Sequence, residues 1–341
     1  MEHATSTASR AQVWRDRKRE LQDYWTRKGY RPSPSKKKTE LTLREVKRFL
    51  HEQFAVEAGN VRHLIEGEVS QAFSFECGEI GYVIRIGKAI EGFKKDAYAY
   101  NHFRSERLPI PRVIKIGYID EQHIFCIAEK MPGITLQDVD SEIMEHLIQP
   151  TTEVWLALKD CDISSTTGFG DFDADGRGAY GTWQEFLLSI LDPHSYSWDR
   201  VIHHLDRRLL KELITAFTSL AKHCPEERYL VHGDFGSNNV LTDGRSITAV
   251  LDWDDAKYGD PLFDVATAYF WSSWLDCMAA QAAYYNACLS AIPGYQERIV
   301  CYQLRIGLAE VYDNVMHQNW KMARWAAKRS AEIAVSIAKR H

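Results

Sequence analysis

Residues 229–253 constrain the fold more than any other part of the chain. The apolar run 229–231 predicts a short strand, and a polar loop with two glycines follows it. The chain then alternates over 239–242 and 247–251, which predicts a hairpin. Because a hairpin turns the chain back on itself, we expect Asp252 to face the side chains of the loop.

The loop carries the residue types that phosphoryl transfer requires. Asp234 and Asn239 follow the pattern H-x-D-x-x-x-x-N, which begins at His232. The reaction needs a carboxylate that orients the attacking hydroxyl, and oxygen ligands that hold Mg²⁺ against the phosphates of a nucleotide. We therefore predict Asp234 as the catalytic base and Asn239 and Asp252 as Mg²⁺ ligands. We expect His232 to brace the loop through hydrogen bonds.

A simpler interpretation gives the same residues structural roles only. Glycine and asparagine are common in turns, and aspartate often caps a loop. However, the histidine, both aspartates, the asparagine and the flanking apolar strands all occur together in this segment. Their coincidence favours the catalytic interpretation.

Apolar periodicity divides the chain into a small β-rich part and a larger helical part. Before residue 131 it predicts helices at 42–54 and 94–104, a hairpin over 69–86, and strands at 113–118 and 124–128. After residue 131 it predicts helices at 142–160, 182–191, 206–223 and beyond 262, with an irregular loop over 168–181. The predicted fold class is α+β with two lobes, and a cleft between lobes is a common small-molecule site.

Charge separates the N-terminus from the rest of the chain. Residues 1–38 contain eleven basic and four acidic residues, so they carry a charge of +7 and the remainder carries −12. The stretch 31–38 combines prolines, serines and lysines, which is typical of a linker. We therefore expect a basic extension and linker at 1–39, an N-lobe at 40–130 and a C-lobe at 131–341.

The acidic body favours a cationic small molecule as partner and disfavours nucleic acid and anionic membranes. A nucleic-acid-binding arm at 10–38 stays open as an alternative. The sequence has no apolar run of membrane-spanning length, no secretion signal and no C-x-x-C pair among its seven cysteines. We expect a cytoplasmic monomer.

Several longer strings resemble the aminoglycoside phosphotransferases, a family related to the protein kinases. They include Glu66-Gly-Glu68, Ala72-Phe-Ser-Phe75, Leu108-Pro-Ile-Pro111, Gly133-Ile-Thr-Leu-Gln-Asp138, the stretch 234–243 and Leu304-Arg-Ile-Gly-Leu308. The resemblance extends from residue 41 to residue 332. It implies a bilobal protein-kinase-like fold, in which a small antiparallel β-sheet lobe binds the nucleotide and a mainly helical lobe binds the drug.

Within that family the resemblance is strongest to the members that phosphorylate hygromycin B. It therefore implies transfer of the γ-phosphoryl group of ATP to a hydroxyl of that antibiotic, which inactivates the drug, with Mg²⁺ as cofactor. GTP stays open as a donor. The resemblance also implies that Glu129-Lys-Met131 contacts the purine as a hinge, so Glu129 and Met131 are predicted nucleotide contacts. Ordinary packing is an alternative role for Met131.

The nucleotide side departs from the kinase pattern at three places. Arg85 stands where the third strand of a kinase fold usually has lysine, and Asp96 stands where the partner glutamate is expected. Because arginine pairs with phosphate and carboxylate oxygens, we predict that Arg85 binds phosphate and pairs with Asp96. The phosphate loop 66–71 has one glycine instead of three. Ser70 is predicted to lie over the phosphates, with a plain hairpin turn as the alternative.

The acceptor side should offer carboxylates for amines and flat rings for sugar faces. The candidate residues lie beside the catalytic loop and on later helices: Asn238, Trp271, Trp274, Asp276, Glu310 and Asp313. Aromatic residues at this spacing are also typical of a helix core, and exposed helix acids are common. The substrate contacts are therefore the part of the site that the sequence constrains least.

Two other functions stay open. The same phosphate machinery serves kinases of another aminoglycoside, a macrolide, choline or a sugar. A kinase-fold binding protein with impaired catalysis would fit Arg85 and the reduced glycine loop. The presence of Asp234, Asn239 and Asp252 together favours an active enzyme.

Overall fold

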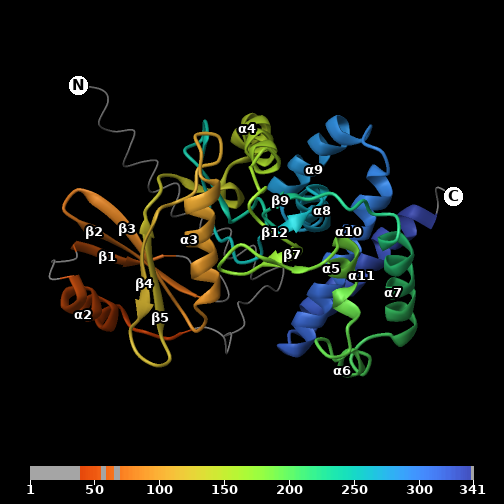
Figure 1. Ribbon diagram of the computed structural model, residues 1–341, viewed down its shortest axis with the longest axis horizontal. Coiled ribbons are helices and arrows are strands. Elements are labelled where there is room, and N and C mark those ends of the chain that lie inside the picture. The colour runs from red at the N-terminus through yellow and green to blue at the C-terminus, as the bar shows by residue number, and fades with distance from the viewer. Residues whose placement is uncertain (1–38, 55–58, 65–69, 339–341) are drawn as a thin grey trace.

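The structure, a computed structural model, describes residues 39–54, 59–64 and 70–338. The basic extension before Thr39, and residues 66–69 of the predicted phosphate loop, lie outside these ranges. A β-rich lobe lies on one side of the molecule and a mainly helical lobe on the other (Figure 1). The predicted α+β class with two lobes is confirmed.

Five antiparallel strands form the sheet of the N-lobe, in the order β1-β2-β3-β5-β4. They are β1 (Gly59–His63), β2 (Gln71–Cys77), β3 (Ile80–Gly87), β4 (Val113–Tyr118) and β5 (Ile124–Glu129). The predicted hairpin is the pair β2 and β3, which runs from Gln71 opposite Ile86 to Cys77 opposite Ile80. This hairpin and the two strands predicted after it are confirmed.

The two predicted helices of the N-lobe cover opposite faces of this sheet. Helix α2 (Leu43–Phe54) buries Leu50 in one cluster with Ile84 and Ile127. Helix α3 (Glu91–Phe103) buries Phe93 against Cys126, whose side chain points to the other face. Figure 1 shows α3 between the sheet and the helical lobe, so this helix contacts both lobes.

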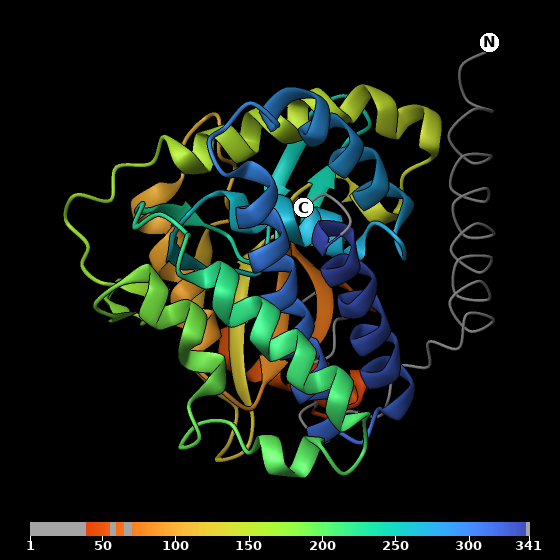
Figure 2. The ribbon, with the colours of Figure 1, turned by 90° about the vertical axis from the view of Figure 1, so that its right-hand side faces the viewer.

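Helices make up most of the C-lobe. They are α4 (Ser141–Lys159), α5 (Trp183–Leu188), α6 (Trp198–Val201), α7 (Arg207–Ala221), α8 (Leu262–Trp271), α9 (Asp276–Leu289), α10 (Tyr295–Met316) and α11 (Trp320–Ala338). Helix α10 packs against α7, α8 and α11, and Figure 2 shows these helices side by side. The predicted helices 142–160 and 206–223 are confirmed. The predicted helix 182–191 is α5 followed by a short 3₁₀ turn, Ser189–Leu191.

Two small sheets hold the predicted catalytic loop between them. Strand β10 (Val240–Thr242) pairs with β11 (Ile247–Val250) and β6 (Ile134–Thr135). Strand β9 (Tyr229–Val231) pairs with β12 (Lys257–Gly259). The loop between β9 and β10 is therefore anchored in a different sheet at each end.

The expectation of an irregular loop over 168–181 is wrong. Strands β7 (Phe169–Phe172) and β8 (Gly178–Tyr180) form a hairpin there. Strand β7 also pairs with β12, where Asp171 lies opposite Lys257. The hydrogen bonds that order this segment therefore come from a strand far along the chain, which a local pattern cannot reveal.

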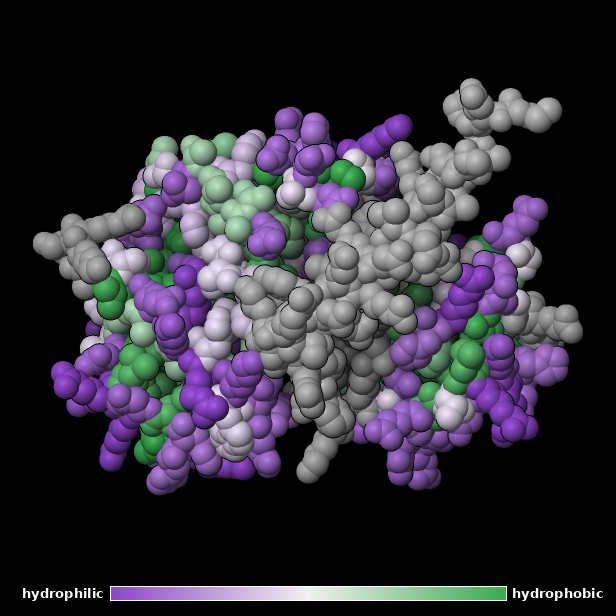
Figure 3. Space-filling view, turned by 180° about the vertical axis from the view of Figure 1, so that it is seen from behind, coloured by the Kyte–Doolittle hydropathy of each residue, from purple (hydrophilic) through white to green (hydrophobic). Residues whose placement is uncertain are grey.

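The face shown in Figure 3 is mainly hydrophilic, with scattered apolar residues. Within the described ranges, no helix combines the length and apolarity that crossing a membrane requires. All seven cysteines are free thiols. Burial of apolar side chains, rather than covalent cross-links, therefore stabilises the described fold.

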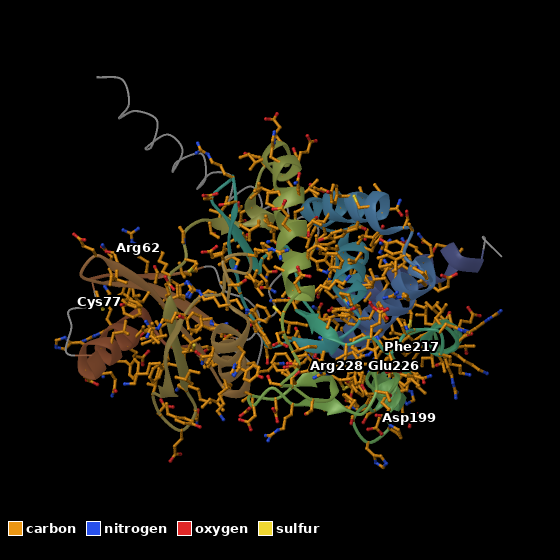
Figure 4. The ribbon with its side chains drawn as sticks, turned by 45° about the horizontal axis from the view of Figure 1, so that its top comes forward. Arg62, Cys77, Asp199, Phe217, Glu226 and Arg228 are labelled. Carbon is orange, nitrogen blue, oxygen red and sulfur yellow. The ribbon has the colours of Figure 1, made fainter. Side chains whose placement is uncertain are left out.

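Two charged side chains anchor the segment that leads into β9, and Figure 4 labels both of them. The carboxylate of Glu226 accepts hydrogen bonds from the backbone N–H groups of Trp183 at 2.6 Å and Gln184 at 3.1 Å, at the start of α5. The guanidinium of Arg228 donates to the carbonyl of Gly168 at 2.7 Å. These contacts fix the strand from which the catalytic loop begins.

Candidate active site

The loop between β9 and β10 depends on two glycines. Gly233 adopts a φ of +87° and Gly236 a φ of +107°, which residues with side chains rarely adopt. At Gly233 a Cβ atom would lie only 2.1 Å from the carbonyl oxygen of Asp255. This close approach requires glycine, and it brings Asp255 next to the loop.

His232 braces the loop, as predicted. Its Nε2 donates to the carbonyl oxygen of Leu251 at 2.9 Å, and the backbone N–H of Asp234 donates to its Nδ1 at 3.3 Å. The side chain is fully buried, and this burial lowers the pKa of His232 to about 4. The imidazole is therefore neutral at pH 7, with one nitrogen donating and the other accepting.

Asp264 is a positioning residue that the sequence analysis missed. Its carboxylate, on α8, accepts hydrogen bonds from the backbone N–H groups of His232 at 3.0 Å and Gly233 at 2.7 Å. Burial raises the pKa of Asp264 to about 6, although both hydrogen bonds act in the opposite direction. The signal available in the sequence was one acidic residue in the otherwise apolar stretch 262–271.

Asp234 and Asn239 are in direct contact. The Nδ2 of Asn239 donates to the carbonyl oxygen of Asp234 at 3.0 Å and to its Oδ2 at 2.7 Å. Burial raises the pKa of Asp234 to about 7, and the negative charges of Asp255 and Asp252 add to the increase. A carboxyl group with this pKa is well matched to proton transfer near neutral pH.

Asp252 reaches the loop through the β10–β11 hairpin, as expected. The backbone N–H of Leu251 donates to the carbonyl oxygen of Asn239 at 2.7 Å, so Asp252 follows a residue that is bonded to the loop. Asp252 adopts a φ of +61°, and its side chain is 56% exposed. Its carboxylate is thus open to a ligand.

The donor atoms at this point suit a magnesium ion bound together with a nucleotide. Because Nδ2 of Asn239 is used twice by Asp234, its Oδ1 lies on the other side of the amide and is available to a cation. The exposed carboxylate of Asp252 supplies further oxygen. Mg²⁺ in nucleotide sites is usually held by one or two protein oxygens together with phosphate oxygens and waters.

Arg85 and Asp96 form the predicted ion pair, which joins strand β3 to helix α3. The guanidinium of Arg85 also lies 3.5 Å from the Oδ1 of Asp252 and 5.1 Å from the ring centre of Phe93. The Oδ1 of Asp96 accepts a hydrogen bond from the backbone N–H of Trp253 at 2.9 Å. An arginine of the N-lobe therefore lies beside a predicted metal ligand of the C-lobe.

The predicted nucleotide contacts lie at the ends of interior strands of the N-lobe sheet. Glu129 ends β5, opposite Tyr82 of β3, and the half-buried Met131 follows it. Ser70 precedes β2 and neighbours Gly87 at the end of β3, where a Cβ atom would lie 3.8 Å from the Cβ of Ser70. No contact with a nucleotide is part of this structure, so these residues stay predictions.

Two of the predicted acceptor residues lie on elements that adjoin the catalytic loop. Asn238 belongs to the loop itself and is exposed. Asp276 is the exposed first residue of α9, and Met278 and Gln281 of the same helix pack against Gly236. Helix α9, whose first residue is Asp276, is therefore packed against the loop.

The predicted tryptophans belong to an aromatic cluster that includes a residue missed by the sequence analysis. Trp325 of α11 stacks on Trp271, with ring centres 5.2 Å apart, and meets Trp274 edge to face at 4.9 Å. Arg329 supports the cluster by donating to the carbonyl oxygens of Tyr269 at 2.7 Å and Phe270 at 3.1 Å. The two indoles are half-buried, so they combine packing with an accessible face.

Glu310 and Asp313 lie in the last turns of α10. The side chain of Asn314 donates to the Oε2 of Glu310 at 3.1 Å, and Nδ1 of His317 lies 3.3 Å from Oδ1 of Asp313. Both carboxylates thus have partners on their own helix, which packs against α7, α8 and α11. None of these contacts joins them to the catalytic loop.

Known proteins are similar to this chain in sequence and in fold. Residues 78–298 match the phosphotransferase enzyme family. The chain is 42% identical over 300 residues to hygromycin-B 4-O-kinase of Escherichia coli, and the alignment covers 88% of this chain and 87% of that protein. The similarity thus extends well beyond the loop motif, to both lobes.

Solved structures of aminoglycoside phosphotransferases have a similar fold. A thermostable mutant of aminoglycoside phosphotransferase APH(4)-Ia, in a ternary complex with AMP-PNP and hygromycin B, matches with a TM-score of 0.82 at 42% identity, over 86% of this chain and 99% of that chain. The GDP complex of wild-type aminoglycoside 2'-phosphotransferase-IIIa matches with a TM-score of 0.64 at 16% identity, over 87% and 99%. The second match concerns the fold alone, and the predicted bilobal kinase-like fold is confirmed.

Proposed function

Since the chain belongs to the phosphotransferase enzyme family, we propose that it transfers the γ-phosphoryl group of ATP to the 4-hydroxyl of hygromycin B, and so confers resistance to that antibiotic. One observation carries the proposal. Asn239 is hydrogen-bonded to Asp234, the charge of Asp252 raises the pKa of Asp234, and Arg85 of the other lobe lies 3.5 Å from Asp252. The similarity to hygromycin-B 4-O-kinase over both lobes supports the choice of acceptor.

In the proposed mechanism Asp234 orients the attacking hydroxyl and accepts its proton. The hydrogen bond from Asn239 holds the carboxylate, while His232 and Asp264 hold the backbone of the loop. Phosphoryl transfer relies on positioning and on electrostatic stabilisation, so the reaction requires no covalent nucleophile.

Asn239 and Asp252 would hold Mg²⁺, which neutralises charge on the phosphate oxygens when it is bound. Arg85 would bind the α- and β-phosphates. Its 3.5 Å approach to Asp252 supports this role, since it puts a fixed positive charge beside the proposed metal site. Ser70 would donate to the phosphates from the neighbouring strand end.

The N-lobe, 40–130, would bind the nucleotide, with Glu129 and Met131 against the purine. The C-lobe, 131–341, would bind the antibiotic. A single chain supplies every residue that this mechanism uses, so we propose a monomer as the active form. GTP remains an alternative donor.

The acceptor would lie between the catalytic loop and α9. An aminoglycoside carries amines, which the exposed carboxylate of Asp276 would bind, and sugar rings, whose faces Trp271 and Trp274 would cover. Asn238 would bond to hydroxyl groups beside the reacting one. Glu310 and Asp313 are proposed as outer contacts for further amines. The charge of −12 outside residues 1–38 favours a cationic drug as well.

The test is a coupled assay of ADP release with Mg²⁺ and ATP, run on hygromycin B beside kanamycin, a macrolide and choline. We expect turnover on hygromycin B alone, and loss of that turnover in the Asp234→Asn variant. Turnover on another compound of the panel would support a phosphotransferase but show that hygromycin B is not its substrate. Nucleotide binding without turnover on any acceptor would contradict the proposed enzyme.

A further inference from the structure

One face of α3 is pressed against the segment that follows Asp252. Gly92, Lys95 and Asp96 occur at positions i, i+3 and i+4, which lie on one side of a helix. All three contact residues 253–256 of the C-lobe. The N-lobe helix and the proposed metal-binding segment therefore form one contact surface.

Lys95 makes the central contact of this surface. Its ammonium group donates to the carbonyl oxygens of Asp254 and Ala256, the latter at 3.2 Å. It also lies 4.9 Å from the ring centre of Phe172. The residue is only 5% exposed, so both backbone acceptors are reached inside the protein.

Lys95 contacts backbone carbonyls, whereas the lysine of a typical kinase site contacts phosphates. The group that reaches the proposed metal ligand from the N-lobe is the guanidinium of Arg85, 3.5 Å from Asp252. The ammonium of Lys95 points instead to backbone carbonyls of the C-lobe. It therefore acts on the shape of the segment and not on the phosphates.

The neighbouring residues of α3 complete the contact. Asp96 accepts the hydrogen bond from the backbone N–H of Trp253 at 2.9 Å. A Cβ atom at Gly92 would lie 2.9 Å from Cγ and from Oδ1 of Asp254, so glycine permits the helix to approach this closely. Three backbone groups in the four residues after Asp252 are thus held by two consecutive side chains of α3.

Asp252 needs such support because of its backbone conformation. A φ of +61° in a residue other than glycine is strained and persists only where the surroundings hold it. On one side the bond from Leu251 to Asn239 holds the chain, and on the other side the contacts of Lys95 and Asp96 do so.

We propose that Lys95 is a positioning residue for metal binding: by holding the carbonyl groups of Asp254 and Ala256, it fixes Asp252 in the conformation that binds Mg²⁺ with the nucleotide. This inference rests on the proposed role of Asp252 as a metal ligand. Its consequence is that metal affinity depends on how α3 of one lobe is seated against the other lobe.

The test compares Lys95→Met with Lys94→Met. Methionine keeps most of the length of the side chain and removes the ammonium group in both variants. Lys94 is the adjacent residue of the same helix, but its side chain is 45% exposed and pairs with Glu91 at 3.2 Å, which makes it a matched control. Binding of ADP to the full-length protein is measured by calorimetry over a range of Mg²⁺ concentrations and in EDTA.

For Lys95→Met we expect the Mg²⁺ concentration that gives half-maximal ADP binding to rise about 10-fold, as is typical when a partner of a metal ligand is removed. ADP binding in EDTA should equal that of the wild type. Lys94→Met should equal the wild type in both measurements. Amide hydrogen exchange over 253–256 should accelerate in Lys95→Met, while exchange in β9 stays unchanged.

Equal Mg²⁺ dependence in Lys95→Met and the wild type would overturn the inference. If Lys95→Met does not fold, Gly92→Ala provides the second variant, because it displaces Asp254 and leaves Lys95 in place; an unchanged Mg²⁺ dependence in that variant would likewise overturn it. The proposed function fails separately, through the absence of Mg²⁺-dependent ADP binding or of acceptor turnover in the wild type. If the wild type shows no Mg²⁺-dependent ADP binding, this inference is also wrong. If it binds ADP with Mg²⁺ but does not phosphorylate hygromycin B, the inference about Lys95 still holds.

Discussion

The donor side and the acceptor side of the cleft are built in different ways. On the donor side, Asp234, Asn239, Asp96 and Arg85 are all linked to each other or to backbone groups by hydrogen bonds and ion pairs. On the acceptor side, Asn238, Asp276 and Asp313 are exposed, while Trp271 and Trp274 pack on Trp325. One side is held by bonds between the lobes, and the other offers an open surface.

This difference matches the two tasks of the proposed reaction. Phosphoryl transfer is accelerated by groups that are already in position, so the donor side gains from rigid contacts. A drug with several amines and rings is recognised by charge and by flat apolar surfaces, which require less fixed geometry. Mutations on the donor side should therefore lower kcat, and mutations on the acceptor side should raise the KM of the drug.

The largest effect is expected from Asp234→Asn. Asparagine keeps the size of the side chain but cannot accept the proton of the hydroxyl, so kcat should fall about 1000-fold. The affinity for ADP should change little, because the assigned metal ligands and Arg85 remain. Steady-state kinetics and calorimetry measure the two quantities. A variant that keeps more than a tenth of the wild-type kcat would break the assignment of the base.

Arg85→Met is expected to have the second-largest effect. It removes the charged fork proposed to bind the phosphates, and loss of two charge-assisted hydrogen bonds costs about 3 kcal/mol, or roughly 100-fold in kcat/KM for ATP. Arg85→Lys should retain an intermediate activity, since it keeps the charge but not the fork. If the methionine variant binds ATP as the wild type does, Arg85 is only a structural partner of Asp96.

A pH experiment tests the rigidity of the donor side. The pKa of His232 is about 4 in the folded protein and 6.5 in the unfolded chain, so the stability that the neutral ring contributes is present above pH 6.5 and is lost as the pH falls towards 4. Between pH 6.5 and pH 5 this loss amounts to about 2 kcal/mol in the free energy of unfolding.

The comparison protein for this experiment is His232→Gln, which lacks the titrating group. Urea unfolding gives the free energy of unfolding of both proteins at each pH. The difference between them should change by about 2 kcal/mol between pH 6.5 and pH 5. Asp264 is common to both proteins, so its own titration cancels in the difference. A constant difference between the two proteins at pH 6.5 and pH 5 would show that the ring does not hold the loop in its neutral form.

The smallest effects are expected on the acceptor side. Asp276→Asn removes the exposed carboxylate at the start of α9 and should raise the KM for the drug about 10-fold, since a hydrogen bond to a charged group contributes about 1.5 kcal/mol. Asp313→Asn should have a weaker effect, because its carboxylate already pairs with His317. The exposed Asp199 of α6 offers a matched control, Asp199→Asn, with no change expected. If Asp313→Asn raises the KM more than Asp276→Asn does, the drug binds near the end of α10 and not beside α9.

The chemistry of the donor side could be predicted from the sequence because its residues are close along the chain. Asp234, Asn239 and Asp252 lie on one loop and one hairpin, so their spacing already implies their approach. Helices and hairpins with strong local periodicity were predictable for the same reason. The pairing of Arg85 with Asp96 followed from a family resemblance and from the chemistry of the arginine fork.

Contacts between distant segments could not be predicted. Strand β12 pairs with β7 of the β7–β8 hairpin, and Asp264 holds the catalytic loop from a mainly apolar helix. Trp325 joins Trp271 from the last helix of the chain. In each case the partner is set by tertiary packing, which leaves no periodic signal in either segment.

The most direct test of the central claim is the identity of the product. Hygromycin B is incubated with ATP, Mg²⁺ and the protein, and the mixture is followed by ³¹P NMR. We expect one new phosphate ester resonance coupled to a ring proton of the drug, ADP in equal amount, and neither signal with Asp234→Asn. Release of inorganic phosphate with unmodified hygromycin B, or no consumption of ATP, would contradict it.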